Sequence, residues 1–169
     1  YENITKWGAG NVVITNNKVD DFKALRGFFD IVLIDAPCSG EGMFRKSHFE
    51  RSHWSPKVVQ ESANVQQYLL TAALDLVADG GTLIYSTCTY EEAENEANIR
   101  QLYASSAERL RPVNLDRLPD DGLKQVDIAT GSQYKQHGYY AMPHRVRGEG
   151  QFVTAVQVSN THSQTKRLN

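Results

Sequence analysis

The sequence predicts an α/β fold in which at least two parallel strands are joined by a crossover helix. Two runs rich in β-branched and apolar residues, 28–35 and 82–87, have the composition of strands. Between them, apolar side chains recur at three- and four-residue steps, which is typical of a helix. Because a strand–helix–strand unit within one sheet is right-handed and usually joins neighbouring strands, we expect these two strands to be parallel and adjacent.

The crossover helix carries sequence signals at both ends. Ser55 is a favourable N-cap residue and Pro56 suits the first helical position, while the glycine pair 80–81 is expected to end the helix. The apolar positions that we expect to face the core are Val58, Val65, Leu69, Ala72, Ala73, Leu76 and Val77. The run 28–35 is apolar almost throughout, which predicts a strand that is buried on both faces.

The rest of the chain adds shorter elements. We predict a strand over 11–15 from its β-branched residues, and a helix over 91–103 whose acidic first turn complements the helix dipole. Three further short strands are predicted at 112–115, 138–142 and 151–158. A polar connection is expected over 117–136. The last residues, 159–169, have little apolar content and are expected to be flexible.

Composition limits the kind of protein that this chain can be. With 169 residues and 40% hydrophobic content, it is long enough for one domain with a single core. It has no apolar run near the roughly 18 residues of a membrane span, and no secretory signal at its start. Two cysteines are too few for a disulfide framework, so reduced thiols, no metal site and a cytoplasmic location are expected. The net charge of -2 excludes an overall basic footprint and still allows a local one.

Both cysteines directly follow predicted strands. Cys38 lies in DAPCSGEGMFRK, residues 35–46, after the first strand, and Cys88 lies in GTLIYSTCTY at the end of the second. In parallel sheets, ligands bind beyond the carboxyl ends of the strands. We therefore expect the two thiols to share one rim of the sheet with the carboxylate of Asp35.

Each of these residues also has a simpler explanation. Free cysteines are often small buried hydrophobes, Asp35 could cap a turn, and the loop glycines could only shape the backbone. A phosphatase loop is a further alternative, but Arg45 lies one residue beyond the usual spacing from Cys38, and Glu41 would repel an anion. A dithiol redox pair lacks the C-x-x-C spacing. The position of both cysteines at neighbouring strand ends favours a shared chemical site.

Three segments of the chain carry a family resemblance: DAPCSGEGMFRK, NVQQYLLTAALDLVADGGTLIYSTCTYEEAENE and PHRVRGEGQF. They resemble the motifs of the Nol/Nop/Sun family of RNA (cytosine-5)-methyltransferases, and most of all its bacterial rRNA small-subunit methyltransferase F branch. The resemblance implies a partial Rossmann-like class I methyltransferase sheet, S-adenosylmethionine as cofactor, and RNA, most often small-subunit rRNA, as partner and substrate. Residues 1–158 would form the carboxyl-terminal part of a catalytic domain.

Methylation at carbon 5 of cytosine can use two thiols and a carboxyl group. Carbon 5 is a poor nucleophile until a thiolate adds to carbon 6, and covalent catalysis of this kind divides a difficult step in two. A carboxyl group can protonate or hydrogen-bond to ring nitrogen 3, a role that we assign to Asp35. A second thiol or base then assists loss of the carbon 5 proton and release of the thioether. Composition and spacing leave open which thiol attacks.

The family resemblance assigns different roles to the two thiols. In the RNA family the nucleophile is the cysteine of the TCT motif, which corresponds to Cys88, and the PCSG cysteine, here Cys38, assists product release. The DNA cytosine methyltransferases instead use a proline-cysteine motif, which would point to Cys38. We expect Cys88 as nucleophile and Cys38 as release residue. Asp35 and Pro37 would then contact the flipped cytosine and the reacting end of the cofactor.

Basic and aromatic residues follow the first cysteine loop and precede the last predicted strand. We predict RNA contacts for Arg45, Lys46, His53, His144 and Arg145. A solvated loop and a structural turn are the alternatives for these segments. Gln66 and residues 94–96 also match family positions, and their spacing predicts that they lie on a helix surface.

The chain differs from the family pattern around the cofactor. The glycine-rich cofactor loop and the first two strands of the fold are absent from it. Lys18 stands where an aspartate near the adenine is usual, so we assign this contact to Asn17, with Asp20 as the alternative. In the strand order 3-2-1-4-5-7-6 of this fold, the strand at 28–35 would then have an unpaired edge.

Two expectations follow from these missing strands. The chain by itself should be inactive and should bind the cofactor weakly or not at all. It should be ordered by a displaced strand pairing, by a partner copy or by the missing half of the domain. The alternative function is a non-catalytic, methyltransferase-like RNA-binding module.

Overall fold

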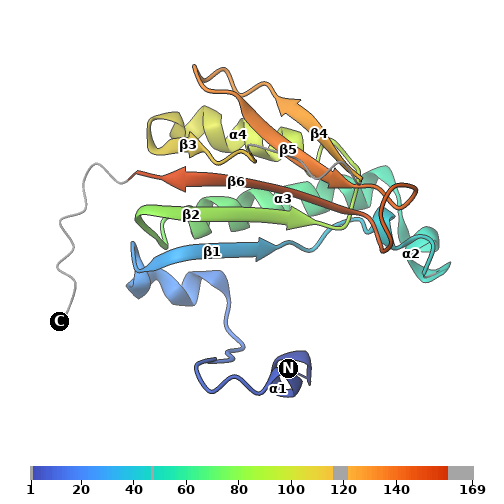
Figure 1. Cartoon of the computed structure of the whole chain (residues 1–169), viewed down its shortest axis with the longest axis horizontal. Helices are drawn as coiled ribbons and strands as arrows, with labels where there is room; N and C mark the ends of the chain where they lie inside the picture. The colour runs from blue at the N-terminus through green and yellow to red at the C-terminus, as the bar shows by residue number, and fades with distance from the viewer. Residues whose placement is uncertain (1, 47, 116–121, 160–169) are drawn as a thin grey trace.

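The computed structural model describes residues 2–46, 48–115 and 122–159. Within them, one six-stranded sheet has the order β1-β2-β6-β5-β4, and β3 pairs with the end of β6 (Figure 1). The strands are β1 (Phe29–Asp35), β2 (Val77–Thr87), β3 (Leu110–Pro112), β4 (Leu123–Ile128), β5 (Gln136–Ala141) and β6 (Gln151–Val158). As predicted, β1 and β2 are parallel neighbours, whereas the other pairs are antiparallel. The order β1-β2-β6-β5 corresponds to the 4-5-7-6 half of the expected sheet, which confirms a partial Rossmann-like fold.

Two longer helices, α3 (Pro56–Leu74) and α4 (Glu96–Ser106), both lie behind the sheet in the view of Figure 1. The short helices are α1 (Glu2–Trp7), η1 (Val19–Leu25), η2 (Glu41–Met43), α2 (His48–His53) and η3 (Ala107–Arg109). Helix α3 begins as predicted, because the Ser55 hydroxyl accepts a hydrogen bond from the Val58 N–H at 3.3 Å. No helix in the described part of the chain is both long and apolar enough to cross a membrane.

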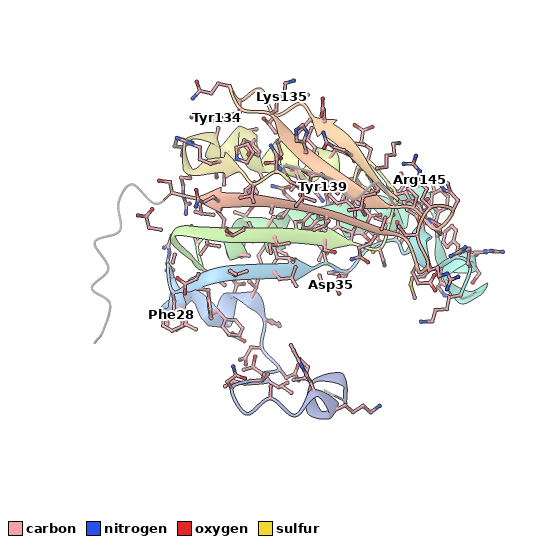
Figure 2. The ribbon with its side chains drawn as sticks, in the orientation of Figure 1. Phe28, Asp35, Tyr134, Lys135, Tyr139 and Arg145 are labelled. Carbon is pink, nitrogen blue, oxygen red and sulfur yellow. The ribbon has the colours of Figure 1, made fainter. Side chains whose placement is uncertain are left out.

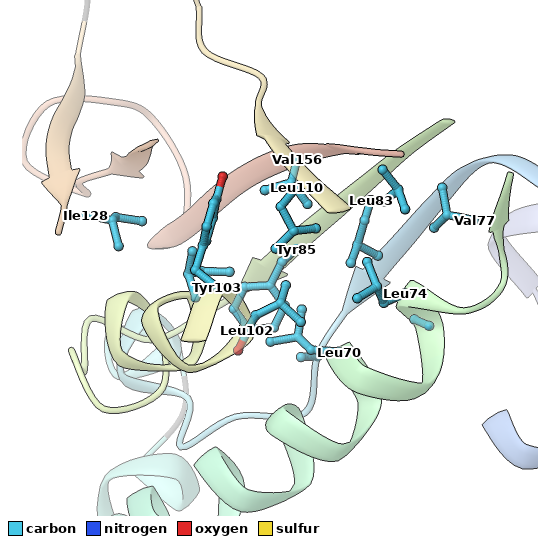
Figure 3. Close-up of a cluster of buried hydrophobic side chains, with 14 of the residues drawn as sticks. Leu70, Leu74, Val77, Leu83, Tyr85, Leu102, Tyr103, Leu110, Ile128 and Val156 are labelled. Atoms are coloured by element: carbon cyan, nitrogen blue, oxygen red, sulfur yellow. The ribbon is translucent and has the colours of Figure 1, made fainter. Parts of the chain in front are cut away.

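The core lies between these two helices and the sheet (Figure 3). Its largest fully buried apolar side chains come from α3, β2, α4, β3 and β6, and include Leu70, Leu83, Tyr85, Ile99, Leu102, Tyr103, Leu110 and Phe152. Removing each such side chain from water stabilises the fold by about 1.5–3 kcal/mol. The buried positions of α3 are Val59, Ala63, Gln66, Leu70, Ala73 and Leu74. The predicted apolar face was therefore wrong at Val65, which is 47% exposed because the helix turns it away from the sheet. Leu76 and Val77 are buried as predicted, but they lie beyond the end of α3.

Strand β1 is present as predicted, but it is not buried on both faces. Ile31 and Leu33 are 65% and 63% exposed, whereas Val32 and Ile34 pack against the core. The alternation arises because α3 and α4 cover the same face of the sheet, and because β1 is an edge strand. Among the described residues, no strand pairs with the outer edge of β1, so displaced strand pairing does not occur there.

Two further predictions at the amino-terminal side and after α3 were wrong. Residues 11–15 form no strand and are exposed, since no described strand lies beside them to accept their backbone hydrogen bonds. Helix α3 ends at Leu74, before the glycine pair that was expected to end it. That pair lies inside β2 instead, where Gly80 has φ +76 and the pairing with β1 is interrupted.

The later elements match the predictions in part. Strand β6 has the predicted bounds, β5 begins two residues earlier than predicted, and β3 is shifted toward the amino terminus. Helix α4 begins only at Glu96, because the preceding residues form a turn. Strand β4 was not predicted, since its polar sequence LKQVDI is typical of a connection and lies within the polar connection expected over 117–136. The predicted flexible tail lies, except for its first residue, outside the described residues.

Candidate active site at the ends of two parallel strands

The register between β1 and β2 brings the two cysteine loops together. Asp35, the last residue of β1, is paired with Ser86, and the Ala36 N–H donates to the Ser86 carbonyl at 2.9 Å. The loops that follow place Cys38 Sγ 3.0 Å from Cys88 Sγ. Both thiols are half-buried, and Asp35 is exposed at the same strand end (Figure 2). The rim predicted from the strand ends is therefore present.

The contact between the two thiols changes the acidity of Cys38. Its pKa is raised well above the usual thiol range, first by the hydrogen bond with Cys88 and then by burial. A thiol with a raised pKa keeps its proton at neutral pH and can share it with the sulfur beside it. The pair thus combines a proton donor and a potential nucleophile in one contact.

Backbone contacts hold the two loops against each other. The Gly42 N–H donates to the Cys88 carbonyl at 2.8 Å, and the Ser39 and Thr89 hydroxyls are 2.9 Å apart. The Tyr90 N–H donates to the Glu41 carboxylate at 3.1 Å. Each cysteine therefore lies in a loop that is fastened to the loop of the other.

A buried polar network lies beneath the Cys38 loop. The Glu94 carboxylate accepts hydrogen bonds from the Ser39 N–H at 3.1 Å and from Gln66 Nε2 at 2.6 Å. Gln66 Nε2 also donates to the Pro37 carbonyl at 2.8 Å. Gln66 and Glu94 are 0% exposed, so the prediction that they lie on a helix surface was wrong. Gln66 occupies the buried stripe of α3, a signal that its helical spacing from Leu70 already contained.

A separate set of bonds supports the Cys88 loop. Asn95, also predicted to be on a helix surface, is fully buried. Its side chain accepts a hydrogen bond from the Thr87 hydroxyl at 2.7 Å and donates to the Thr89 carbonyl at 3.0 Å. The side-chain amide of Asn95 therefore fixes the residues on both sides of Cys88. Sequence reasoning missed these supporting residues because their partners lie in other elements.

The residues beside β1 fit S-adenosylmethionine, the cofactor implied by the resemblance, only in part. A cavity of about 470 Å³ beside β1 ends at Asp35 and is otherwise lined by apolar side chains, including Val19, Ile31 and Leu33. Of the described residues that line it, only Asp35 is polar, whereas a nucleoside needs several hydrogen-bond partners. The cavity therefore does not suit the adenosine of this cofactor, while Asp35 and Pro37, both exposed, stay the predicted contacts with its reacting end.

Asn17 and Asp20, the residues predicted to contact the adenine, form hydrogen bonds and an ion pair with neighbouring side chains. Asn17 Nδ2 donates to Asp21 Oδ2 at 3.3 Å, within the segment that starts η1. Asp20 accepts a hydrogen bond from the Tyr68 hydroxyl and pairs with Lys23 Nζ at 2.9 Å. These contacts fasten η1 to itself and to α3. They do not bring Asn17 or Asp20 into the rim that holds the two thiols.

Arg45 joins two of the predicted RNA-binding segments. Its guanidinium donates to the Gly148 carbonyl at 2.7 Å and to the Pro143 carbonyl at 3.5 Å, in the connection between β5 and β6. This connection carries His144 and Arg145, which are exposed at the end of the sheet where α2 lies (Figures 1 and 2). Lys46 and His53, on the other segment, are also exposed, and the His53 ring contacts the Ser52 hydroxyl at 3.1 Å.

The strand order and the paired cysteines at the strand ends define this chain as part of a Rossmann-like, methyltransferase-type domain. Residues 1–157 match the family described as 16S rRNA methyltransferase RsmB/F, and the chain belongs to this family.

Named relatives agree with this assignment. The chain is 40% identical over 119 residues to ribosomal RNA small subunit methyltransferase F of Cronobacter sakazakii, an alignment that covers 70% of this chain and 25% of that protein. It is 35% identical over 158 residues to the protein of the same name from Psychromonas ingrahamii, covering 93% of this chain and 31% of that one. The chain thus spans between a quarter and a third of these relatives.

The fold is also similar to that of a solved structure. The crystal structure of NSun6 from Pyrococcus horikoshii with SFG matches 94% of this chain and 38% of its own, with a TM-score of 0.67. The sequence identity is 21%, so this likeness shows the fold alone.

Proposed function

We propose that the protein to which this chain belongs is an S-adenosylmethionine-dependent RNA (cytosine-5)-methyltransferase that acts on 16S rRNA in the cytoplasm. The contact between Cys38 and Cys88 carries the proposal, because cytosine methylation through a covalent intermediate needs one thiol to attack and a second group to assist release. The family and its named relatives support rRNA as substrate. The structural neighbour with SFG, an analogue of S-adenosylmethionine, supports the cofactor.

Cys88 acts as the nucleophile in this proposal. Its Sγ forms a bond to carbon 6 of cytosine as the double bond between carbons 5 and 6 opens. The Asp35 carboxyl group stabilises the charge that develops on the ring through a hydrogen bond to nitrogen 3. S-adenosylmethionine, when bound next to Asp35 and Pro37, supplies the methyl group that carbon 5 receives.

Cys38 acts in the second half of the reaction. The proton on carbon 5 leaves to a base, the bond between carbon 6 and the sulfur breaks, and the electron pair returns to Cys88. Cys38 Sγ is 3.0 Å from the sulfur that must leave, so it can assist this step directly. Its raised pKa supports a role in holding and moving a proton.

The exposed basic residues at the same end of the sheet would contact the RNA. Arg45, Lys46, His53, His144 and Arg145 come from two segments that Arg45 fastens together. Phosphate contacts of this kind position an RNA, while an extruded base enters the site. The target nucleotide would thus meet the thiols from the side of α2 and the connection between β5 and β6.

Covalent trapping tests the proposal. The full-length protein and its Cys88→Ala and Cys38→Ala variants are incubated with S-adenosylmethionine and 16S rRNA that contains 5-fluorocytidine, whose fluorine blocks release. We expect an adduct with the wild type and with Cys38→Ala, and none with Cys88→Ala. On ordinary rRNA, only Cys38→Ala should accumulate an adduct, because release is slowed. Loss of the adduct in Cys38→Ala alone would exchange the two roles.

The same experiment distinguishes a methyltransferase from the alternative, a non-catalytic RNA-binding module. A protein that binds 16S rRNA but forms no adduct in any variant would be a methyltransferase-like RNA-binding module without catalysis. The 169-residue chain by itself is expected to be inactive, since its cavity beside β1 lacks the polar groups for a nucleoside. Calorimetric titration with S-adenosylmethionine tests this, and micromolar affinity for the isolated chain would contradict it.

A further inference from the structure

We infer that Glu94 is a positioning residue that holds Cys38 opposite Cys88, acting through the Ser39 N–H and through Gln66. Its catalytic consequence rests on the proposed function, whereas its effect on the distance between the thiols does not. The geometry that carries the inference is a pair of tethers, one on each side of Cys38.

The first tether holds the residue after Cys38. The Ser39 N–H points at the Glu94 carboxylate and lies 3.1 Å and 3.3 Å from its two oxygens. Ser39 is 4% exposed and Glu94 is 0% exposed, so water does not compete for this bond. A hydrogen bond is electrostatically stronger in a buried site of low dielectric than in water.

The second tether holds the residue before Cys38. Gln66 Nε2 donates to the Pro37 carbonyl at 2.8 Å and to Glu94 Oε2 at 2.6 Å. Its Oε1 accepts from Asn98 Nδ2 at 2.9 Å, which fixes the orientation of the amide. Without Glu94, Gln66 would lose its strongest acceptor, and both tethers of Cys38 would weaken together.

Glu94 itself is firmly placed. Its backbone carbonyl accepts hydrogen bonds from the Tyr85 hydroxyl at 2.7 Å and from Asn98 Nδ2 at 2.9 Å. Tyr85 belongs to the core and lies on β2, the strand that ends at the Cys88 loop. The carboxylate is therefore presented from a rigid base, as a positioning residue must be.

The loop of Cys88 does not depend on Glu94 for its own support. The Asn95 side chain holds that loop through the Thr87 hydroxyl and the Thr89 carbonyl. Loss of the Glu94 carboxylate should therefore shift Cys38 while leaving Cys88 in place. The Ser39 and Thr89 hydroxyls, 2.9 Å apart, would keep the loops loosely joined.

The test measures how readily the two thiols meet. Full-length protein is treated with diamide, which removes one hydrogen from each thiol as the S–S bond forms and is itself reduced to the hydrazine. The peptide pair that joins Cys38 to Cys88 is then quantified over time by mass spectrometry. We expect the disulfide to form about tenfold more slowly in Glu94→Ala, since the Ser39 N–H and Gln66 Nε2 both lose their acceptor on Glu94.

Matched variants make the result specific. Glu94→Gln keeps an oxygen acceptor and should restore most of the rate, while Glu94→Asp draws the acceptor back from Ser39 and should give an intermediate rate. Glu96→Gln, two residues further along at the first position of α4, alters a carboxylate that accepts from the Tyr140 hydroxyl instead, and should leave the rate unchanged. Circular dichroism shows which variants are folded, and Glu94→Asp decides the matter if Glu94→Ala is not.

Two results overturn the inference: folded Glu94→Ala or Glu94→Asp protein that forms the disulfide at the wild-type rate, and a wild-type protein that forms none. In the trapping assay, Glu94→Ala should also accumulate an adduct on ordinary rRNA, as Cys38→Ala does. A wild type that forms no adduct with 5-fluorocytidine RNA would remove the proposed function, and the disulfide rates would still decide the role of Glu94.

Discussion

The backbone N–H of Gly42 donates to the carbonyl of Cys88 at 2.8 Å, so the loop after β1 rests directly on the proposed nucleophile. There is no room for a side chain at this point. A Cβ on Gly42 would lie 2.8 Å from the Cys88 carbonyl oxygen and 2.5 Å from that of Gly150. Three segments that are far apart in the sequence therefore meet around one glycine.

Gly42→Ala should destabilise the protein and disturb the site. The added methyl group must push the Cys88 carbonyl or Gly150 aside, and overpacking of this kind costs about 1–3 kcal/mol. Urea unfolding measures the loss of stability, and 5-fluorocytidine trapping measures the effect on Cys88. Gly10→Ala is the matched control, because no atom lies within 4 Å of a Cβ there. Equal urea midpoints for the two variants would show that the Cys88 and Gly150 carbonyls leave room for a methyl group at Gly42.

Cys38 should become more reactive when Cys88 is removed. The hydrogen bond with Cys88 is the largest cause of the raised pKa of Cys38, so Cys88→Ala lowers this pKa and increases the thiolate fraction. Alkylation by iodoacetamide between about pH 7.5 and 9.5, around the ordinary thiol pKa, should therefore be faster at Cys38 in the variant. The rates should become equal in urea, where the contact is lost. Equal rates in the folded proteins would contradict the prediction.

The same raised pKa makes stability depend on pH. The unfolded chain releases the Cys38 proton near the ordinary thiol pKa of about 8.5, while the folded chain holds it to higher pH. The contribution of this group to stability is therefore complete below about pH 8.5 and is lost as the pH rises further. Urea midpoints measured from pH 7 upward should fall less steeply in Cys38→Ser than in the wild type.

Lys46 and Arg145 should contribute to RNA binding through charge alone. Replacing either by alanine should weaken binding to all RNAs to a similar extent, and should reduce the slope of log K against log salt by about 0.7–0.9. Filter binding over a range of salt concentrations measures both effects. Lys57→Ala, on α3 and paired with Glu61, is the control. If the salt dependence were unchanged in both Lys46→Ala and Arg145→Ala, the RNA would bind elsewhere on the protein.

Leu83→Ala and Leu33→Ala should have very different costs in this chain. Leu83 is 1% exposed, so its truncation leaves a cavity and should cost about 2–5 kcal/mol. Leu33 lies on a neighbouring strand but is mostly exposed, so its truncation should cost no more than about 0.5 kcal/mol. Urea unfolding compares the two. In the full-length protein, a larger cost at Leu33 would show that further chain covers β1.

Elements with a strong local pattern were predicted well. The apolar run of β1, the Ser55 and Pro56 start of α3, and the bounds of β6 all follow from short-range propensity and periodicity. The errors arose where a longer-range contact decides the outcome. Residues 11–15 have the composition of a strand without a neighbour, and Gly80 and Gly81 shape the start of β2 rather than the end of a helix.

By itself, the sequence determined that an aspartate ends one of two neighbouring parallel strands and that a cysteine follows each of them, because strand composition and the crossover helix are local properties. Only the tertiary structure decided that the thiols lie 3.0 Å apart and that Glu94 and Gln66 hold the loop of Cys38 from beneath. It also decided that Arg45 fastens the connection between β5 and β6. These contacts join residues separated by 29 to 103 positions, and local periodicity carries no information about which distant segment a side chain will meet.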